Sequence, residues 1–318
     1  MHSGLRLVLA FLAIVPAPVS LHAAGPDSLR TETFTLASAA LGEPRIINVY
    51  TPPGHESDTG TLPVLYMLDG GMAEDFPHVM TTVDSLIALR RIRPVILVGI
   101  ENTERRRDLT GPTTVAADSA IAPRVGGSAA FRAFIRDELM PEVKRRYRTT
   151  GKAVIVGESL AGLFVVETLL LEPALFRGYI ALSPSVWWNE GAVVRLARAP
   201  GGTPNTSGRV LYLAAANEPK IADGTAELAG ILKSQPPGTL LVIYAPRPDL
   251  AHDTIFRAVA PGAFRWIHAT VRQIDLSQSV HSVRTGRIPS LRMIYSPTSF
   301  QAASASMRSN SALMSVPS

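Results

Sequence analysis

Residues 153–162 read Ala-Val-Ile-Val-Gly-Glu-Ser-Leu-Ala-Gly, and an apolar run follows from Leu163 to Leu171. A short β-branched strand thus leads into a serine with small residues around it, and a helix begins at once. The pattern is typical of a sharp strand–turn–helix that lifts a serine above a sheet. Gly157 and Ala161 suit this turn, because larger side chains would collide with the neighbouring strand and helix. A glycine turn with serine as a helix N-cap is the alternative interpretation.

The first interpretation gives the turn a chemical role. Ser159 would be an exposed nucleophile, and the backbone N–H of Leu160 would point from the helix N-terminus at a developing negative charge. A serine hydroxyl needs a base to take its proton, so this hypothesis depends on partners elsewhere in the chain.

Composition limits the classes of protein to consider. The chain has 318 residues, of which 46% are hydrophobic, enough for one large α/β domain or two small ones. It has no cysteine, which excludes disulfides, thiolate metal sites and a cysteine nucleophile. The formal charge of +5 arises from Arg6 and from an arginine-rich end, so residues 25–269 are close to neutral. The charge therefore gives no argument for a nucleic-acid partner.

The two ends of the chain differ from its middle. Residues 1–24 combine a basic start, a short apolar run and small residues, which predicts a signal peptide and an exported protein, periplasmic or secreted. A retained membrane anchor is the alternative. Residues 270–318 are rich in Ser and Arg and lack periodicity, so we expect a disordered or loosely attached tail, or a frameshifted end.

The middle of the chain, residues 25–269, predicts an α/β domain. Strands are expected at 31–36, 45–50, 63–68, 94–100, 153–156, 176–185, 209–215 and 239–244. Helices are expected at 84–91, 128–147 with Ser128 as N-cap, 163–171, 225–232 and 258–269. The last six strands alternate with helices or long connections. This alternation predicts a doubly wound, mostly parallel sheet with helices on both faces and its functional site above the carboxyl ends of the strands.

Several candidate features follow these strand ends. Gly70 and Gly71 could let backbone N–H groups approach a ligand, or could form an ordinary turn. The charged segment 101–110 favours a solvated loop with local ion pairs. Trp187 and Trp188 follow the sixth strand, where they would line a pocket or pack in the core.

The order of the candidates along the chain is informative. Ser159 follows the fifth predicted strand, Glu218 the seventh and His252 the eighth, which is the nucleophile–acid–histidine order of α/β-hydrolases. Asp249 and Asp223 compete with Glu218 as the acid, but Asp249 would have to fold back on its own loop. His252 is preferred over the other histidines, which lie in the ends, a loop or helical segments. No metal-ligand spacing and no nucleotide-binding glycine motif occurs, so we expect neither a metal nor a cofactor.

Four stretches together resemble the putative-esterase family of α/β-hydrolases, the esterase D-like group that includes ferric-enterobactin-type esterases and S-formylglutathione hydrolases. They are residues 64–71, 99–110, 157–162 and 182–188. The resemblance covers about residues 30–269 and implies an α/β-hydrolase fold with about eight strands. It implies a serine hydrolase of a small carboxylic ester, with a siderophore-type lactone among the candidate substrates.

The resemblance also implies roles for individual residues. Ser159 matches the family nucleophile, His252 the base, and the N–H groups of Leu160 and Gly71 the oxyanion hole, while Glu218 matches the acid by position. The expected substrate pocket comprises Gly70, Glu158, Trp187 and Trp188. The chain departs from the family pattern at two positions. Ala161 stands where the turn around the nucleophile has its second glycine, and Glu158 stands where the residue before the nucleophile is frequently histidine. The expected partner is a small-molecule ester, without nucleic acid or stable membrane insertion after leader removal, and the oligomeric state stays open. An acyltransferase and a non-catalytic binding protein on the same scaffold are the alternatives.

Overall fold

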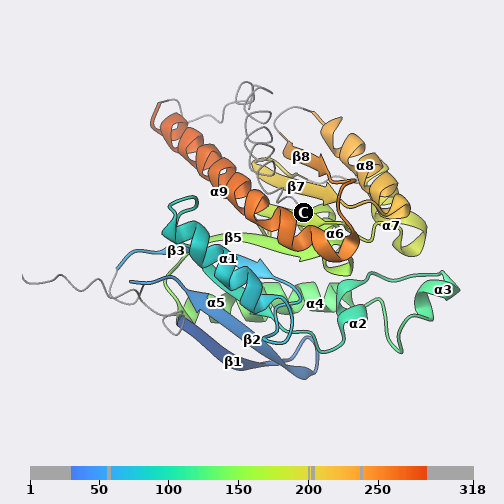
Figure 1. The fold of residues 1–318 in the computed structure, drawn as a ribbon, viewed down its shortest axis with the longest axis horizontal. Helices are drawn as coiled ribbons and strands as arrows, with labels where there is room; N and C mark the ends of the chain where they lie inside the picture. Colours follow the sequence, from blue (N-terminus) through green and yellow to red (C-terminus); the bar gives the residue numbers. More distant parts are fainter. Residues whose placement is uncertain (1–29, 56–58, 200, 202–204, 237–238, 285–318) are drawn as a thin grey trace, which may run out of the picture.

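One mixed sheet of eight strands forms the centre of the molecule (Figure 1). The computed structural model describes residues 30–55, 59–199, 201, 205–236 and 239–284. The strands are β1 (Arg30–Ser38), β2 (Glu43–Thr51), β3 (Leu62–Met67), β4 (Ile96–Ile100), β5 (Thr149–Glu158), β6 (Gly178–Leu182), β7 (Arg209–Ala215) and β8 (Leu240–Pro246). Each predicted strand is therefore confirmed, with small shifts at its ends.

The strand order is β1-β2-β4-β3-β5-β6-β7-β8. β1 pairs antiparallel with β2, and β2 antiparallel with β4, whereas every other pair is parallel. All five residues of β4 and of β6 are buried, as expected for strands covered on both faces. Since β3 to β8 run in one direction, the loops that leave β3, β5, β6, β7 and β8 meet at one edge of the sheet.

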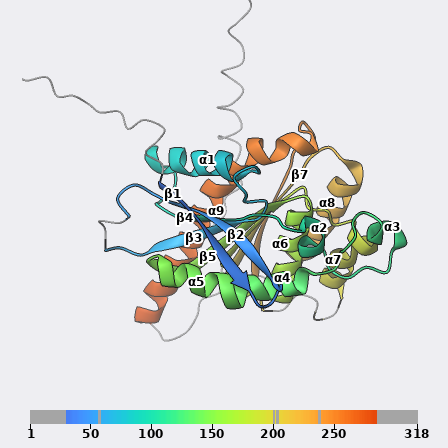
Figure 2. The ribbon, with the colours of Figure 1, turned by 90° about the horizontal axis from the view of Figure 1, so that it is seen from below.

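Helices cover both faces of the sheet (Figure 2). They are α1 (Phe76–Ala88), α2 (Arg105–Leu109), α3 (Ala116–Ser119), α4 (Ser128–Phe134), α5 (Met140–Arg146), α6 (Leu160–Leu171), α7 (Trp188–Arg198), α8 (Pro219–Lys233) and α9 (His252–Arg284), with a π-helical turn, η2 (Ile135–Leu139), between α4 and α5. α1 and α9 pack on one face through a core that includes Phe76 and Phe264. α4 to α8 pack on the other face, around residues such as Phe131 and Phe164. The predicted doubly wound architecture is confirmed.

Three predicted helices differ in detail, apart from the last one. The helix predicted at 225–232 begins at Pro219. The helix predicted at 84–91 begins earlier, at Phe76, and the one predicted at 128–147 contains the π-helical turn. Ser128 is not an N-cap. It is the first residue of α4, and its hydroxyl donates to Oε1 of Glu167 at 3.0 Å. A side-chain partner in a distant helix cannot be read from local periodicity.

The last described helix corrects the predicted tail boundary. α9 runs from His252 to Arg284, well beyond the helix predicted at 258–269. Ile274 is only 3% exposed, and Asp275 forms ion pairs with Lys152 at 2.6 Å and Arg177 at 3.3 Å. Residues 270–276 are therefore part of the packed domain. The rest of the predicted tail, 285–318, and the predicted signal peptide, 1–24, lie outside the described residues.

The charged segment 101–110 is not the predicted solvated loop. It contains α2, and Asp108 is 1% exposed and paired at 2.5 Å with Arg45, which is fully buried. The Arg45 guanidinium also donates to the carbonyl of Glu101 and lies 5.1 Å from the centre of the Phe131 ring. These contacts fix the loop after β4 against the core.

Among the described helices, none combines the length and the apolar character needed to cross a bilayer.

Candidate active site

The turn between β5 and α6 has the geometry predicted from the sequence. Ser159 has φ +59° and ψ −121°, a conformation that non-glycine residues rarely adopt and that often marks functional positions. Its N–H donates to the Leu182 carbonyl, and its own carbonyl accepts from the N–H groups of Leu163 and Ser185. A Cβ at position 157 would lie 2.5 Å from the backbone of Ala161, so only glycine fits there. The serine is thus held rigidly at the sheet edge.

The helix that follows supplies a backbone donor beside this serine. Leu160 is the first residue of α6, where an N–H has no intrahelical acceptor. It also lies at the positive end of the helix dipole. Its N–H is available to a negatively charged oxygen near Ser159.

The histidine and acid predicted from chain order lie together. His252 begins α9, Glu218 directly precedes α8, and Nδ1 of His252 contacts Oε2 of Glu218. Both atoms are shielded from water, and neither has another polar partner within the described residues. A backbone hydrogen bond of 3.0 Å from Asn217 to Leu250 joins the two loops that carry them.

The competing acids are placed differently. Asp249 forms a two-point contact with Arg247, at 2.8 and 2.6 Å, and this arginine lowers the pKa of its carboxyl. Asp223 is exposed on α8. Among these three acids, Glu218 is the one that contacts His252 in the described part of the chain.

The two glycines after β3 have distinct surroundings. A Cβ on Gly70 would lie 2.4 Å from the backbone of Gly99, so this glycine permits close packing of two loops. The N–H of Gly71 donates to Oε2 of Glu74 at 2.7 Å, and the N–H of Glu74 donates back to the Gly71 carbonyl at 3.0 Å. The second bond closes a tight backbone turn, and the carboxylate of Glu74 folds back onto the first amide of that turn. The amide predicted for the oxyanion hole is thus engaged by a carboxylate.

Glu74 belongs to a polar network that sequence reasoning missed. The amide of Asn102 donates to Glu74 at 2.8 Å and to Asp69 at 2.6 Å. Arg105 then binds both carboxylate oxygens of Asp69, at 2.6 and 2.9 Å. In the sequence, the one local sign of this network is an acidic residue, Glu74, three positions after Gly71 and shortly before a helix.

Comparison with known proteins places the chain in a family. Residues 38–219 match the model of the family described as "Putative esterase". The chain belongs to this family.

Individual relatives agree with this assignment. The esterase-family chain is 33% identical over 153 residues to the ferri-bacillibactin esterase BesA of Bacillus subtilis, a match that covers 42% of this chain and 51% of that protein. It is 31% identical over 205 residues to the siderophore triacetylfusarinine C esterase of Aspergillus fumigatus, covering 58% of this chain and 63% of that protein. The matches therefore span between half and two thirds of these relatives.

Solved structures give the same fold. An IroE-like serine hydrolase from Shewanella oneidensis superposes with a TM-score of 0.68 at 26% identity, over 82% of this chain and 90% of that one. The siderophore hydrolase EstA from Aspergillus nidulans has a TM-score of 0.63 at 20% identity, over 82% and 100%. The esterase-family chain has the α/β-hydrolase fold.

Glu158, which precedes the serine, has an unusual electrostatic environment in this family member. The pKa of its carboxyl is raised to about 8, mainly by burial and also by the nearby charges of Asp75, Asp69 and Asp253, against the opposing charge of Arg105. The neutral acid therefore predominates at pH 7, so the carboxyl can donate a hydrogen bond beside the nucleophile.

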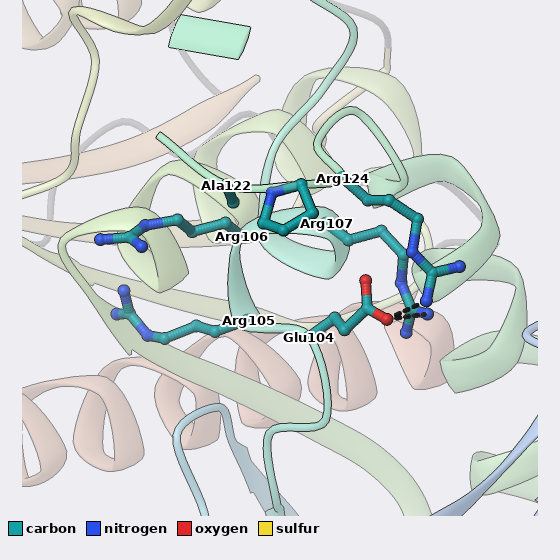
Figure 3. A pocket seen from close by; sticks show the side chains of 7 residues that line it. Glu104, Arg105, Arg106, Arg107, Ala122 and Arg124 are labelled. Carbon is teal, nitrogen blue, oxygen red and sulfur yellow. Dashed lines mark hydrogen bonds and ion pairs between the residues drawn. The ribbon is translucent and has the colours of Figure 1, made fainter. Parts of the chain in front are cut away.

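A cavity of about 610 Å³ opens beside α2 (Figure 3). It is lined by Glu104, Arg105, Arg106, Arg107, Ala122, Pro123 and Arg124. Arg124 pairs with Glu104, and Arg107 binds Glu43 and Asp108. Arg106 is exposed, and among the lining arginines it alone has no carboxylate partner within the described residues. The cavity thus offers an uncompensated positive charge.

The two tryptophans after β6 have separate positions. Trp188 is 2% exposed, and its indole N–H donates to the Gly111 carbonyl at 2.8 Å, so it packs in the interior and lines a second cavity of about 150 Å³. Trp187 is 37% exposed. Of the two, Trp187 is the one that a substrate could reach.

Proposed function

We propose that this protein is a serine esterase that hydrolyses a small carboxylic ester through an acyl-enzyme. The observation that carries the proposal is the contact between His252 and Glu218 at the same sheet edge as the strained turn of Ser159. Family membership supports the reaction class.

The roles follow from the chemistry of the groups. Oγ of Ser159 attacks the ester carbonyl carbon while Nε2 of His252 takes its proton, and Glu218 at Nδ1 holds the imidazole tautomer and stabilises the imidazolium. The tetrahedral intermediate collapses, and the alcohol leaves with the proton from His252. Water then attacks the acyl-enzyme with His252 again as base, which releases the acid and restores the serine.

The oxyanion is assigned to the N–H groups of Leu160 and Gly71. Such a donor contributes on the order of 3 kcal/mol of transition-state stabilisation. Because the Gly71 amide donates to Glu74, this carboxylate has to withdraw before the amide can bind the substrate oxygen.

For the substrate, we propose a siderophore ester that carries anionic groups. The names of the matched relatives support this class, as several are siderophore esterases. The cavity beside α2 supports it too, because Arg106 offers an unpaired cation to an acidic substrate group. We also propose export from the cytoplasm, on the composition of residues 1–24.

Hydrolysis of p-nitrophenyl acetate by the parent protein and by Ser159→Ala tests the reaction class. We expect turnover in the parent, its loss in the variant with an unchanged circular dichroism spectrum, and covalent labelling of Ser159 by a fluorophosphonate. A parent that neither hydrolyses the ester nor accepts the label contradicts the proposal.

A further inference from the structure

The nucleophile has a second hydroxyl beside it. Oγ of Ser159 lies 3.3 Å from Oγ of Ser185, and either group can be the donor. Within the described residues, Ser185 is the side chain that hydrogen-bonds the nucleophile. Ser185 lies in the loop between β6 and α7.

The backbone holds this neighbouring hydroxyl in place. The N–H of Ser185 donates to the Ser159 carbonyl at 3.0 Å, so the two residues are joined by main chain as well as side chain. Two positions earlier, Ser183 has φ +40°, and its Oγ accepts a hydrogen bond from the Ala216 N–H at 2.9 Å. These hydrogen bonds therefore connect the loop both to the turn at Ser159 and to the residue that follows β7.

Burial restricts Ser185 further, because it is only 2% exposed. A shielded hydroxyl has few alternative partners, and water cannot readily replace it. Its hydrogen bond to the nucleophile is therefore part of the architecture of the site.

We propose that Ser185 is a positioning residue, whose hydroxyl donates to Oγ of Ser159 and holds that oxygen in line for attack. This inference rests on the proposed esterase function. The donated hydrogen bond strengthens as negative charge grows on the attacking oxygen while His252 takes the proton. Ser185 itself loses no proton and forms no bond to the substrate, so the reaction balances as described above.

The expected effect lies in acylation and not in substrate binding. One neutral hydrogen bond corresponds to a change of about 3- to 10-fold in a rate constant. Ser185→Ala should lower the rate constant of the p-nitrophenol burst by about this factor and leave the half-saturating ester concentration unchanged. Ser185→Cys has a slightly larger side chain that still donates a hydrogen bond, but more weakly, so its rate should fall between those of the parent and Ser185→Ala.

Ser128→Ala is the matched control. Ser128 is a fully buried serine whose hydroxyl bonds Glu167 on the α4 side of α6, so this variant also loses one buried hydroxyl. We expect it to acylate at the parental rate even where its thermal stability falls.

The outcomes separate the two hypotheses. A parent that neither hydrolyses the ester nor accepts the fluorophosphonate label overturns the esterase function itself. An active parent whose Ser185→Ala variant acylates at the parental rate overturns the role of Ser185. So does a loss that tracks thermal stability equally in Ser185→Ala, Ser185→Cys and Ser128→Ala. If Ser185→Ala does not fold, Ser185→Cys decides alone, by a slower burst at an unchanged half-saturating concentration.

Discussion

Nδ1 of His252 contacts Oε2 of Glu218, although the two residues lie on different loops that leave the neighbouring strands β7 and β8. The contact brings an acid to one nitrogen of the imidazole and leaves the other nitrogen, Nε2, for the hydroxyl proton of Ser159 in the proposed mechanism. In the loop after β8, Asp249 pairs with Arg247.

Glu218→Gln should lower kcat by about 100-fold or more, because the imidazole loses its orienting carboxylate and the charge that stabilises the imidazolium. Asp249→Asn is the control, since its carboxylate pairs with Arg247, and we expect it to keep near-parental kcat. Steady-state hydrolysis of p-nitrophenyl acetate measures both. A larger loss in the Asp249 variant than in the Glu218 variant would reverse the assignment.

Glu74→Ala should free the Gly71 amide and remove a negative charge next to the proposed oxyanion. We expect tighter binding of a trifluoromethyl ketone, which mimics the tetrahedral intermediate. Glu74→Gln retains an acceptor for the amide and should bind the inhibitor more weakly than Glu74→Ala. Weaker binding to Glu74→Ala than to the parent would show that this carboxylate supports the site.

Glu158 should make activity fall at alkaline pH. Because the pKa of its carboxyl is raised to about 8, its ionisation near that pH places a negative charge beside Ser159, which opposes oxyanion formation. Parental kcat/KM should decline above pH 8, and Glu158→Gln should lack this decline. An identical alkaline limb in the two proteins would refute the role of Glu158.

The same carboxyl should also affect stability. The unfolded chain loses this proton near the ordinary value of 4.5 and the folded protein only near 8, so the parent loses stability between these pH values. Glu158→Gln does not titrate, and its Tm relative to the parent should rise from pH 5 to pH 8 and then level off. Calorimetry at several pH values measures this, and a constant difference would argue against the shifted pKa.

Asp108→Asn should destabilise the fold by about 1.5–3 kcal/mol, because the fully buried Arg45 loses its closest carboxylate and keeps only Glu43, at 3.1 Å, among its carboxylate partners in the described residues. Arg145→Ala, which breaks an exposed pair with Glu142, should cost about 0–1 kcal/mol. Urea unfolding of both variants gives the comparison. Equal losses of unfolding free energy in the two variants would contradict the expectation that the buried pair matters more than the exposed one.

Ile274→Ala should cost about 2–5 kcal/mol, as expected for truncation of a buried aliphatic side chain. Leu276, two positions later on α9, is 54% exposed, and its change to Ala should have little effect. Thermal unfolding measures both, and a neutral Ile274→Ala would mean that this part of α9 does not contribute to the domain.

Local patterns in the sequence determined the sheet. Apolar β-branched runs predicted eight strands. The spacing of glycine, serine and alanine predicted the turn at Ser159, because the residues that must be small for such a turn are close neighbours in the sequence. Chain order also placed Glu218 and His252 after successive strands, which the parallel sheet then brings to one edge.

Only the tertiary structure decided which distant groups meet. The engagement of Gly71 by Glu74, the burial of Asp108 against Arg45 and the hydroxyl of Ser185 beside Ser159 depend on how loops from separate strands pack. α9 continues past residue 269 for the same reason, since Ile274 packs in the core and Asp275 pairs with Lys152 and Arg177. Hydrogen bonds and burial are set by distance in space, and separation along the chain carries little information about that distance.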